Sequence, residues 1–244
     1  MKKGKIIIAN WKMNFLLKDA IVFIKKIILK KKIFKNKLIL CPQSTIISPI
    51  AKLLNKKITL GAQNCHYEKF GSYTGEISPL MLKDIGCSYV IIGHSERREL
   101  QFESNEIIKK KAENAIKNKL NVIMCIGESL VLKKEKKTLS FLFKQLKESL
   151  PKNGTNRNVY IAYEPIWSIG SGLVPKTTEI AKIHRYIKEI IININSAYRN
   201  VKILYGGSVD KKNAEKLLKI NEVDGLLIGG ASLKYKKLVS ILSI

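Results

Sequence analysis

One stretch of the sequence decides the fold, and it reads Val159-Tyr160-Ile161-Ala162-Tyr163-Glu164-Pro165-Ile166-Trp167-Ser168-Ile169-Gly170-Ser171-Gly172. Its first five residues form an apolar run of strand length, and the carboxylate of Glu164 follows at once. In barrels of alternating strands and helices, catalytic groups lie at the C-terminal ends of strands. Gly170 and Gly172 allow the backbone to approach an anion or to move over a bound ligand. The stretch therefore predicts a base beside a lid.

Seven more short apolar runs alternate with amphipathic helical stretches along the chain. The eight runs are residues 5–9, 38–41, 59–62, 89–92, 121–125, 159–163, 202–205 and 225–228. Alternating strands and helices predict a parallel sheet, and eight such units predict an α/β fold, a (β/α)₈ barrel of eight parallel strands surrounded by helices. The 244 residues are close to the roughly 250 of such a barrel, and no Gly/Ser- or Pro-rich linker interrupts them. We expect one barrel domain over residues 1–244.

Two helix starts are marked by their capping residues. Ser78-Pro79 fits an N-cap followed by proline at the first helical position. Ser104 precedes apolar residues at helical spacing, beginning with Ile107 and Ile108. We therefore expect helices to begin after Ser78 and after Ser104.

Four more polar or glycine-rich clusters follow predicted strands. They are Asn10-Trp11-Lys12-Met13-Asn14, Gly93-His94-Ser95-Glu96-Arg97-Arg98, Tyr205-Gly206-Gly207-Ser208-Val209 and Gly229-Gly230-Ala231-Ser232-Leu233. Together with the Glu164 stretch, these segments resemble the triosephosphate isomerase family motif for motif and in the same order. The resemblance extends from Lys5 to Leu233, which is nearly the whole chain.

The resemblance implies a reaction and a set of catalytic residues. The reaction is the interconversion of dihydroxyacetone phosphate and D-glyceraldehyde 3-phosphate through an enediolate, a step of glycolysis and gluconeogenesis that uses no cofactor. The resemblance makes Glu164 the base that moves the proton. Lys12, His94 and Asn10 would stabilise the enediolate, and Glu96 would hold Lys12 in place. Cys125 and Glu128 would support the site by packing and hydrogen bonding.

Position is what favours a catalytic His94 over a histidine that only completes a hydrogen-bond network. His94 ends a strand and precedes a probable helical turn, whose dipole disfavours a charged imidazolium. A neutral ring can still donate a hydrogen bond to a developing oxyanion. The His-Ser-Glu run also matches half of the zinc deaminase motif, but no P-C-x-x-C completes a ligand set. We expect no metal.

The glycine pairs after the seventh and eighth strands indicate a phosphate site. Loops at these places in barrels frequently bind phosphate through backbone N–H groups. By resemblance, the phosphate contacts are Gly170, Ser208, Gly229 and Gly230. Tyr205 and Ser208 would latch the closed lid, residues 165–172.

Two features of the lid and its hinge depart from the family. Ser168 and Ser171 replace the usual Ala and Thr, and Leu173-Val174-Pro175 replaces a hinge that usually begins with lysine. Because Pro175 restricts the hinge, we expect altered lid kinetics with retained chemistry.

Residues 63–77 contain Gly71, Ser72, Thr74 and Gly75 and have no helical period. So long a connection without regular structure is usually functional. In the family this loop inserts into a second subunit. The resemblance therefore implies a homodimer in which Thr74 approaches the partner's catalytic pocket.

The formal net charge of +26 raises the alternative of a nucleic-acid-binding protein. Lysines provide most of the positive charge, they are spread over nearly every predicted helix, and only five arginines occur. This composition fits an AT-rich genome better than a selected patch, so we expect no specific nucleic-acid partner. The positive field would still raise the encounter rate with a dianionic sugar phosphate. A secondary RNA-binding or surface-adhesion role stays open as an alternative.

The four cysteines form no C-x-x-C pair, and three lie in or beside predicted strands. They are expected to be buried reduced thiols, which favours a reducing compartment. The N-terminal apolar run is too short for a signal peptide, and Lys25 and Lys26 interrupt the only other candidate apolar stretch. We expect a cytoplasmic protein without a membrane span.

Another phosphosugar isomerase or epimerase on the same barrel is the nearest alternative, because fold alone does not assign a reaction. The combination of Lys12, His94 and Glu164 argues against it. A metal-dependent epimerase would also need a convergent His/Asp ligand set, and none is evident at the strand ends.

Overall fold

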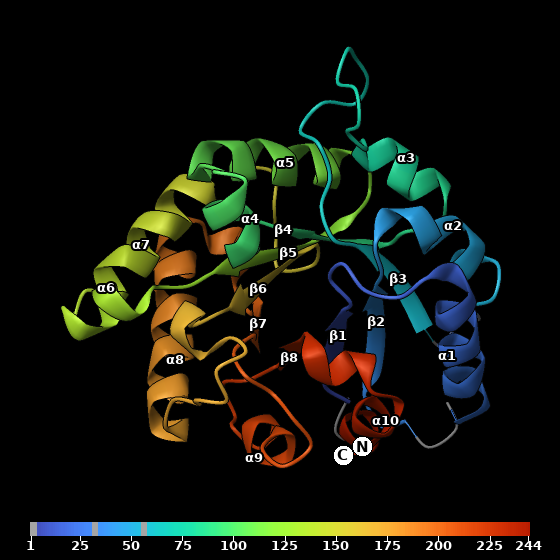
Figure 1. The fold of residues 1–244 in the computed structure, drawn as a ribbon. Helices are drawn as coiled ribbons and strands as arrows, with labels where there is room; N and C mark the ends of the chain where they lie inside the picture. Colours follow the sequence, from blue (N-terminus) through green and yellow to red (C-terminus); the bar gives the residue numbers. More distant parts are fainter. Residues whose placement is uncertain (1–3, 31–33, 55–57) are drawn as a thin grey trace.

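Eight parallel strands close into a barrel in sequence order, with β8 paired to β1 (Figure 1). The computed structural model describes residues 4–30, 34–54 and 58–244. The strands are β1 (Ile6–Asn10), β2 (Lys37–Cys41), β3 (Ile58–Ala62), β4 (Tyr89–Ile92), β5 (Asn121–Ile126), β6 (Val159–Tyr163), β7 (Lys202–Tyr205) and β8 (Gly225–Ile228). Four predicted strands have the observed bounds, and the other four differ by single residues at their ends. The predicted (β/α)₈ barrel is confirmed.

Alternation along each strand divides the core into two layers, because successive side chains of a strand point to opposite faces. The inner cluster fills the barrel and includes Ile8, Ile39 and Leu204. The outer cluster, between the strands and the helices, takes the intervening residues, such as Ile7 and Leu40. Both faces of the sheet are therefore buried, which explains why the strands read as nearly continuous apolar runs.

Helices surround the barrel (Figure 1). The α-helices are α1 (Leu17–Lys30), α2 (Ser44–Ala51), α3 (Pro79–Asp84), α4 (Ser95–Leu100), α5 (Asn105–Lys117), α6 (Leu130–Lys134), α7 (Thr138–Ser149), α8 (Thr177–Ile194), α9 (Ala214–Leu218) and α10 (Tyr235–Ser243). Among the described residues, the 3₁₀ segments are η2 (Ile166–Ser168), η3 (Ser196–Tyr198) and η4 (Gly230–Leu233). The Ser78 hydroxyl accepts from the Met81 N–H and the Ser104 hydroxyl accepts from the Ile107 N–H, which confirms both predicted caps.

The connection between β3 and α3 projects away from the barrel, as the cyan excursion in Figure 1 shows. It has no helix or strand over residues 63–77, as predicted. Its base is closed by the His66 N–H, which donates to the Ile77 carbonyl at 2.8 Å. The His66 ring lies 4.2 Å, centroid to centroid, from both the Tyr67 and the Tyr73 rings. The loop therefore has a small ring cluster of its own, while its tip is exposed.

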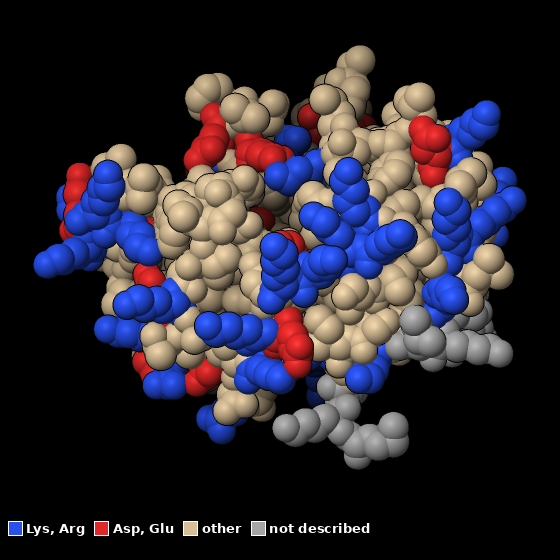
Figure 2. Space-filling view, turned by 60° about the horizontal axis from the view of Figure 1, so that its bottom comes forward, with Lys and Arg blue, Asp and Glu red and all other residues tan. Residues whose placement is uncertain are grey.

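Charge is dispersed over the surface. Figure 2 shows lysine and arginine side chains at both edges and at the centre of one face, with acidic side chains between several of them.

All four cysteines are buried and free, as predicted. In the ranges that the structure describes, no helix is both long and apolar enough to cross a membrane.

Candidate active site

Glu164 lies directly after β6 and is held from three sides. Its backbone N–H donates to the Ile126 carbonyl at 2.7 Å. Its carboxylate is only 2% exposed, and Oε2 accepts from the Ser95 N–H at 3.2 Å. Gly206 leaves room for this side chain, since a Cβ on Gly206 would lie 2.8 Å from Cγ of Glu164. The fold thus places a buried carboxylate at the C-terminal end of the barrel.

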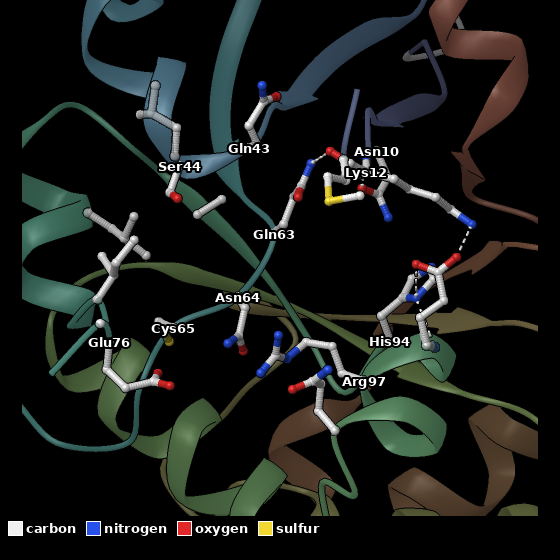
Figure 3. A pocket seen from close by; sticks show the side chains of 18 of the residues that line it. Asn10, Lys12, Gln43, Ser44, Gln63, Asn64, Cys65, Glu76, His94 and Arg97 are labelled. Carbon is white, nitrogen blue, oxygen red and sulfur yellow. Dashed lines mark hydrogen bonds and ion pairs between the residues drawn. The ribbon is translucent and has the colours of Figure 1, made fainter. Parts of the chain in front are cut away.

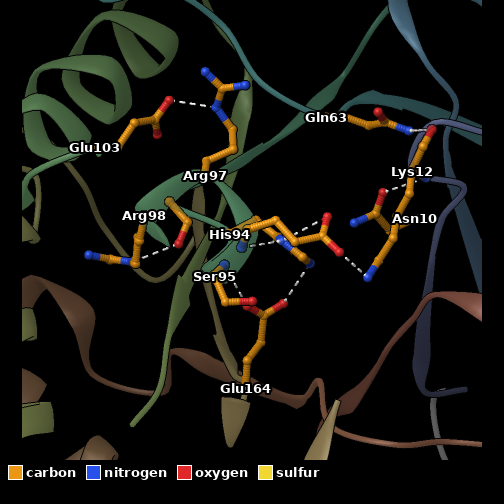
Figure 4. Close-up of polar contacts among 11 residues, drawn as sticks. Asn10, Lys12, Gln63, His94, Ser95, Arg97, Arg98, Glu103 and Glu164 are labelled. Carbon is orange, nitrogen blue, oxygen red and sulfur yellow. Dashed lines mark hydrogen bonds and ion pairs between the residues drawn. The ribbon is translucent and has the colours of Figure 1, made fainter. Parts of the chain in front are cut away.

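His94 follows β4 and is the N-cap residue of α4 (Figure 4). Its Nδ1 accepts a hydrogen bond from the Glu96 N–H at 3.2 Å, so Nδ1 carries no proton in this arrangement. In a neutral ring the proton is then on Nε2, which lies 3.3 Å from Oε1 of Glu164. The helix start therefore selects the tautomer that points an N–H donor at the carboxylate.

Lys12 occupies a turn after β1 with φ of 51°, a conformation that is uncommon for a residue with a side chain. The Asn10 side chain stabilises this turn by accepting from the Lys12 N–H at 3.0 Å. Nζ of Lys12 lies 2.5 Å from a carboxylate oxygen of Glu96. The contact agrees with the expectation that Glu96 holds Lys12. It places the Lys12 ammonium on the residue whose backbone N–H donates to His94.

The predicted residues meet around one cavity of about 310 Å³. The catalytic candidates in its lining are Asn10, Lys12, His94 and Glu164, and the phosphate candidates are Gly170, Ser208, Gly229 and Gly230. Glu96 lies behind Lys12 and lines the neighbouring cavity instead. Reactive side chains and loop backbone from the lid, β7 and β8 thus line the same cavity.

The lid starts with the short helix η2, and Glu128 holds its tryptophan. Nε1 of Trp167 donates to Oε1 of Glu128 at 2.9 Å, and the Tyr163 hydroxyl donates to the same oxygen at 3.2 Å. Burial raises the pKa of Glu128 above its usual value. Nζ of Lys133 lies 3.5 Å from the centroid of the Trp167 ring. The start of the lid is therefore packed, whereas Leu173 at its end is 61% exposed.

A second cavity of about 470 Å³ adjoins the first and shares Asn10, Lys12 and His94 with it. Figure 3 shows its wall, to which Gln43, Ser44, Gln63, Asn64, Cys65, Glu76 and Arg97 contribute. Thr74 is exposed in the projecting loop and is not among the lining residues of either cavity. The chain's own Thr74 thus lies outside its own site.

Three residues that line or support the site were not predicted, and Gly206, which was predicted as part of a phosphate-binding glycine pair, has a second role. The Gln63 side chain donates to the Lys12 carbonyl at 2.9 Å and to the Cys41 carbonyl at 3.0 Å. Ser95 supplies the backbone donor to Glu164, Gly206 makes room for that carboxylate, and Lys237 of α10 lines the cavity beside the phosphate candidates. Gln63 and Ser95 follow strands, so the rule that identified Asn10 and His94 also applies to them. No sequence signal distinguishes Lys237 from its neighbouring lysines.

The Cys125 thiol lies next to the Glu164 carboxylate. Its pKa is raised well above the usual value, first by burial and then by the Glu164 carboxylate. Across the described ranges, no group of three His, Cys, Asp or Glu side chains is placed to hold a metal ion.

Comparison with known proteins decides the family. The family model described as triosephosphate isomerase matches residues 5–244. The chain belongs to the triosephosphate isomerase family. It is 42% identical to a triosephosphate isomerase of Thermodesulfovibrio yellowstonii over 96% of this chain and 98% of that protein. It is 44% identical to one of Wolbachia pipientis wMel over 97% and 92% of the two chains. The crystal structure of triosephosphate isomerase from Bartonella henselae superposes with a TM-score of 0.86 at 37% identity and covers 97% of each chain.

Membership of the triosephosphate isomerase family establishes the activity as well as the fold. The chain is an intramolecular aldose–ketose isomerase that interconverts dihydroxyacetone phosphate and D-glyceraldehyde 3-phosphate. This excludes the alternative of a different phosphosugar isomerase or epimerase.

Proposed function

We propose that Glu164 is the base of the isomerisation and that His94, Lys12 and Asn10 stabilise the enediolate. The observation that carries this proposal is the contact between Oε1 of Glu164 and Nε2 of His94 at the wall of a cavity. Both side chains are less than a tenth exposed, so charge that develops between them is poorly screened by water. A triose bound there would have a base on one side and hydrogen-bond donors on the other.

In the proposed reaction, Glu164 removes a proton from the carbon beside the carbonyl of dihydroxyacetone phosphate. Electrons of the broken C–H bond form the double bond of the enediolate, and the carbonyl oxygen becomes negative. The N–H of His94 and the ammonium of Lys12 stabilise this oxygen. The proton of the C1 hydroxyl then moves to the former carbonyl oxygen on C2, and protonation of C2 by the Glu164 carboxylic acid gives D-glyceraldehyde 3-phosphate. General-base catalysis supplies about 10²–10⁴-fold and electrostatic stabilisation a further large share.

The substrate's phosphate would bind at the opposite end of the cavity. Backbone N–H groups of Gly170, Ser208, Gly229 and Gly230 are its proposed donors, which fits loops that face an anion with their amides. Lys237 also lines this end and adds a positive charge. Binding the phosphate through backbone groups on three loops would orient the reacting carbons towards Glu164.

The lid, residues 165–172, would close over the bound triose. Ile169, Gly170 and Gly172 already line the cavity. Closure would exclude water and so hinder loss of phosphate from the enediolate. We propose Tyr205 and Ser208 as the groups that latch the closed lid.

We also propose that the active form is a homodimer. The projecting loop with Thr74 would enter the partner's larger cavity, which adjoins Lys12 and His94. A Thr74→Arg variant should sediment as a monomer and lose activity, because a long charged side chain would be forced into that cavity. Thr178→Arg on an exposed position of α8 is the control and should stay dimeric. A dimeric and fully active Thr74→Arg protein would contradict the placement.

The remaining expectations complete the proposal. Residues 1–244 form one barrel domain, the protein is cytoplasmic, and the reaction needs neither a metal nor an organic cofactor. The dispersed positive charge in Figure 2 supports steering of an anionic substrate better than a specific nucleic-acid site.

Isotope incorporation tests the proton-transfer chemistry. Dihydroxyacetone phosphate is converted by the wild-type enzyme in D₂O, and the product's deuterium content is measured at the carbon next to the carbonyl. A proton held on Glu164 exchanges with solvent before it returns, so deuterium should enter that position. Product that fully retains the substrate's own hydrogen would instead indicate a direct hydride shift and would exclude Glu164 as the proton carrier.

A further inference from the structure

The hydroxyl of Ser168 joins both ends of the lid to the loop after β7. Ser168 is fully buried at the end of η2. Its Oγ donates to the Leu173 carbonyl at 2.5 Å and accepts from the Ser208 N–H at 3.1 Å. The same oxygen lies 3.3 Å from the Tyr205 hydroxyl. One side chain in the lid thus contacts the hinge that follows the lid and two groups of the distant loop after β7.

Proton counting fixes the direction of these bonds. A serine hydroxyl has one proton, and the Leu173 carbonyl can only accept. The Tyr205 hydroxyl must therefore donate to Ser168, since the proton of Ser168 is already used. The oxygen of Ser168 then makes one donation and accepts two hydrogen bonds, which satisfies its full capacity.

The loop after β7 is shaped to accommodate this arrangement. A Cβ on Gly207 would lie 2.3 Å from the Tyr205 hydroxyl oxygen and 2.8 Å from Oγ of Ser168. Neither hydroxyl has space to yield, because both residues are fully buried. The glycine is therefore required where the two hydroxyl groups meet.

We propose that Ser168 is a positioning residue that restrains the lid by competing with the substrate's phosphate for the Ser208 N–H. The inference rests on the proposed phosphate site, in which that N–H is a donor. The Ser208 N–H donates to Oγ of Ser168, and the same oxygen donates its proton to the Leu173 carbonyl beyond the lid. Phosphate binding would withdraw the Ser208 N–H from an oxygen that also holds the Leu173 carbonyl. Binding of the anion and movement of the lid are then coupled through one oxygen atom.

The proposal predicts the direction of a binding change. Ser168→Ala removes the internal acceptor, so the Ser208 N–H is free for an anion. Inorganic phosphate should then inhibit competitively with a constant about threefold to tenfold lower, the range that one ordinary hydrogen bond supports. KM for D-glyceraldehyde 3-phosphate should fall by a similar factor, while kcat should not rise because the phosphorylated product is also held more tightly.

A matched control separates this effect from a general loss of stability. Ser149→Ala in α7 also removes a fully buried hydroxyl that donates to a backbone carbonyl at 2.5 Å, and Ser149 lines neither cavity. Its phosphate inhibition constant should equal that of the wild type. If Ser168→Ala does not fold, Ser168→Cys is the substitute, because its thiol keeps a weaker hydrogen-bonding group in place. Its phosphate inhibition constant should also fall, but by a smaller factor.

Turnover of phosphate-free D-glyceraldehyde provides the second readout. This substrate does not use the Ser208 N–H, so Ser168→Ala should change its kcat/KM by a smaller factor than it changes the inhibition constant for phosphate. An inhibition constant for phosphate that is unchanged or higher would overturn the proposal, and so would an equal shift with D-glyceraldehyde. If phosphate fails to inhibit the wild type at all, the proposed phosphate site is itself wrong. If phosphate inhibits the wild type and Ser168→Ala with the same constant, the phosphate site stands and only the proposed role of Ser168 is rejected.

Discussion

Nε2 of His94 lies 3.3 Å from Oε1 of Glu164, while Nδ1 of the same ring accepts from the Glu96 N–H. The two contacts assign the ring's proton to the side that faces the carboxylate. A neutral imidazole at this position donates a hydrogen bond and adds no charge to the ground state. The hydrogen bond from Nε2 of His94 to the substrate's carbonyl oxygen therefore strengthens as that oxygen becomes negative. Catalysis requires such an interaction, which is stronger in the transition state than in the ground state.

His94→Gln should lower kcat by about 10²–10³-fold, which is the loss seen when one oxyanion donor is removed, about 2.7–4 kcal/mol. KM should change much less, because the interaction strengthens mainly in the transition state. Steady-state kinetics with D-glyceraldehyde 3-phosphate measures both constants. A loss in kcat smaller than about tenfold would mean that His94 only completes a hydrogen-bond network.

Lys237 should assist binding through its position and not only through its charge. Lys237→Gln should reduce kcat/KM several-fold at low salt, and the reduction should shrink as salt screens the field. Lys236→Gln is the matched control, since it removes the same charge from the same helix at an exposed position outside the cavity. Equal effects of the two variants at every salt concentration would leave Lys237 with no local role.

The hinge at Val174 and Pro175 should limit the rate of lid motion. Pro175 is buried and fixes its own φ while it restricts Val174. Pro175→Ala should therefore speed the exchange of the lid while leaving the Glu164 and His94 chemistry intact. Relaxation-dispersion NMR on the indole N–H of Trp167, which contacts Glu128, reports this motion. Identical exchange rates in the two proteins would reject the hinge hypothesis.

His184 should make the folded protein less stable in acid. Burial lowers the pKa of His184 from 6.5 to about 4, so the unfolded chain binds this proton more tightly than the folded chain. The stability that this group contributes is fully present above about pH 6.5 and is lost as the pH falls towards 4. The loss amounts to about 3 kcal/mol.

Urea unfolding at a fixed protein concentration, near pH 7 and near pH 4.5, measures how much of the free energy of unfolding is lost in acid. His184→Gln has no imidazole to titrate, so its free energy of unfolding should fall less between the two pH values than that of the wild type. Parallel losses in the two proteins would assign the acid sensitivity to other groups.

Much of the fold and site could be predicted because both depend on local patterns. Each strand is an apolar run of four to six residues, and buried parallel strands give that pattern whatever their partners are. Asn10, His94 and Glu164 each stand at or just after a strand end. A parallel barrel brings all such ends to one face, so their meeting follows from topology.

The parts that could not be predicted depend on contacts between distant segments. Gln63 contacts the Lys12 carbonyl only because β3 lies near β1 in the closed barrel. The three bonds of Ser168 reach residues 5, 37 and 40 positions away, and no spacing rule connects them. Lys237 lies in a lysine-rich segment in which only the direction of α10 selects one side chain for the cavity.

The most direct test of the account is the turnover of Glu164→Gln beside the wild type, with both proteins shown to be folded and of equal oligomeric state. Glutamine keeps the size of the side chain but cannot accept the substrate's proton. We predict fast conversion of D-glyceraldehyde 3-phosphate by the wild type without added metal or cofactor, and a loss in kcat of at least about 10²-fold in the variant. A Glu164→Gln enzyme with nearly wild-type kcat would contradict the assignment of Glu164 as the base.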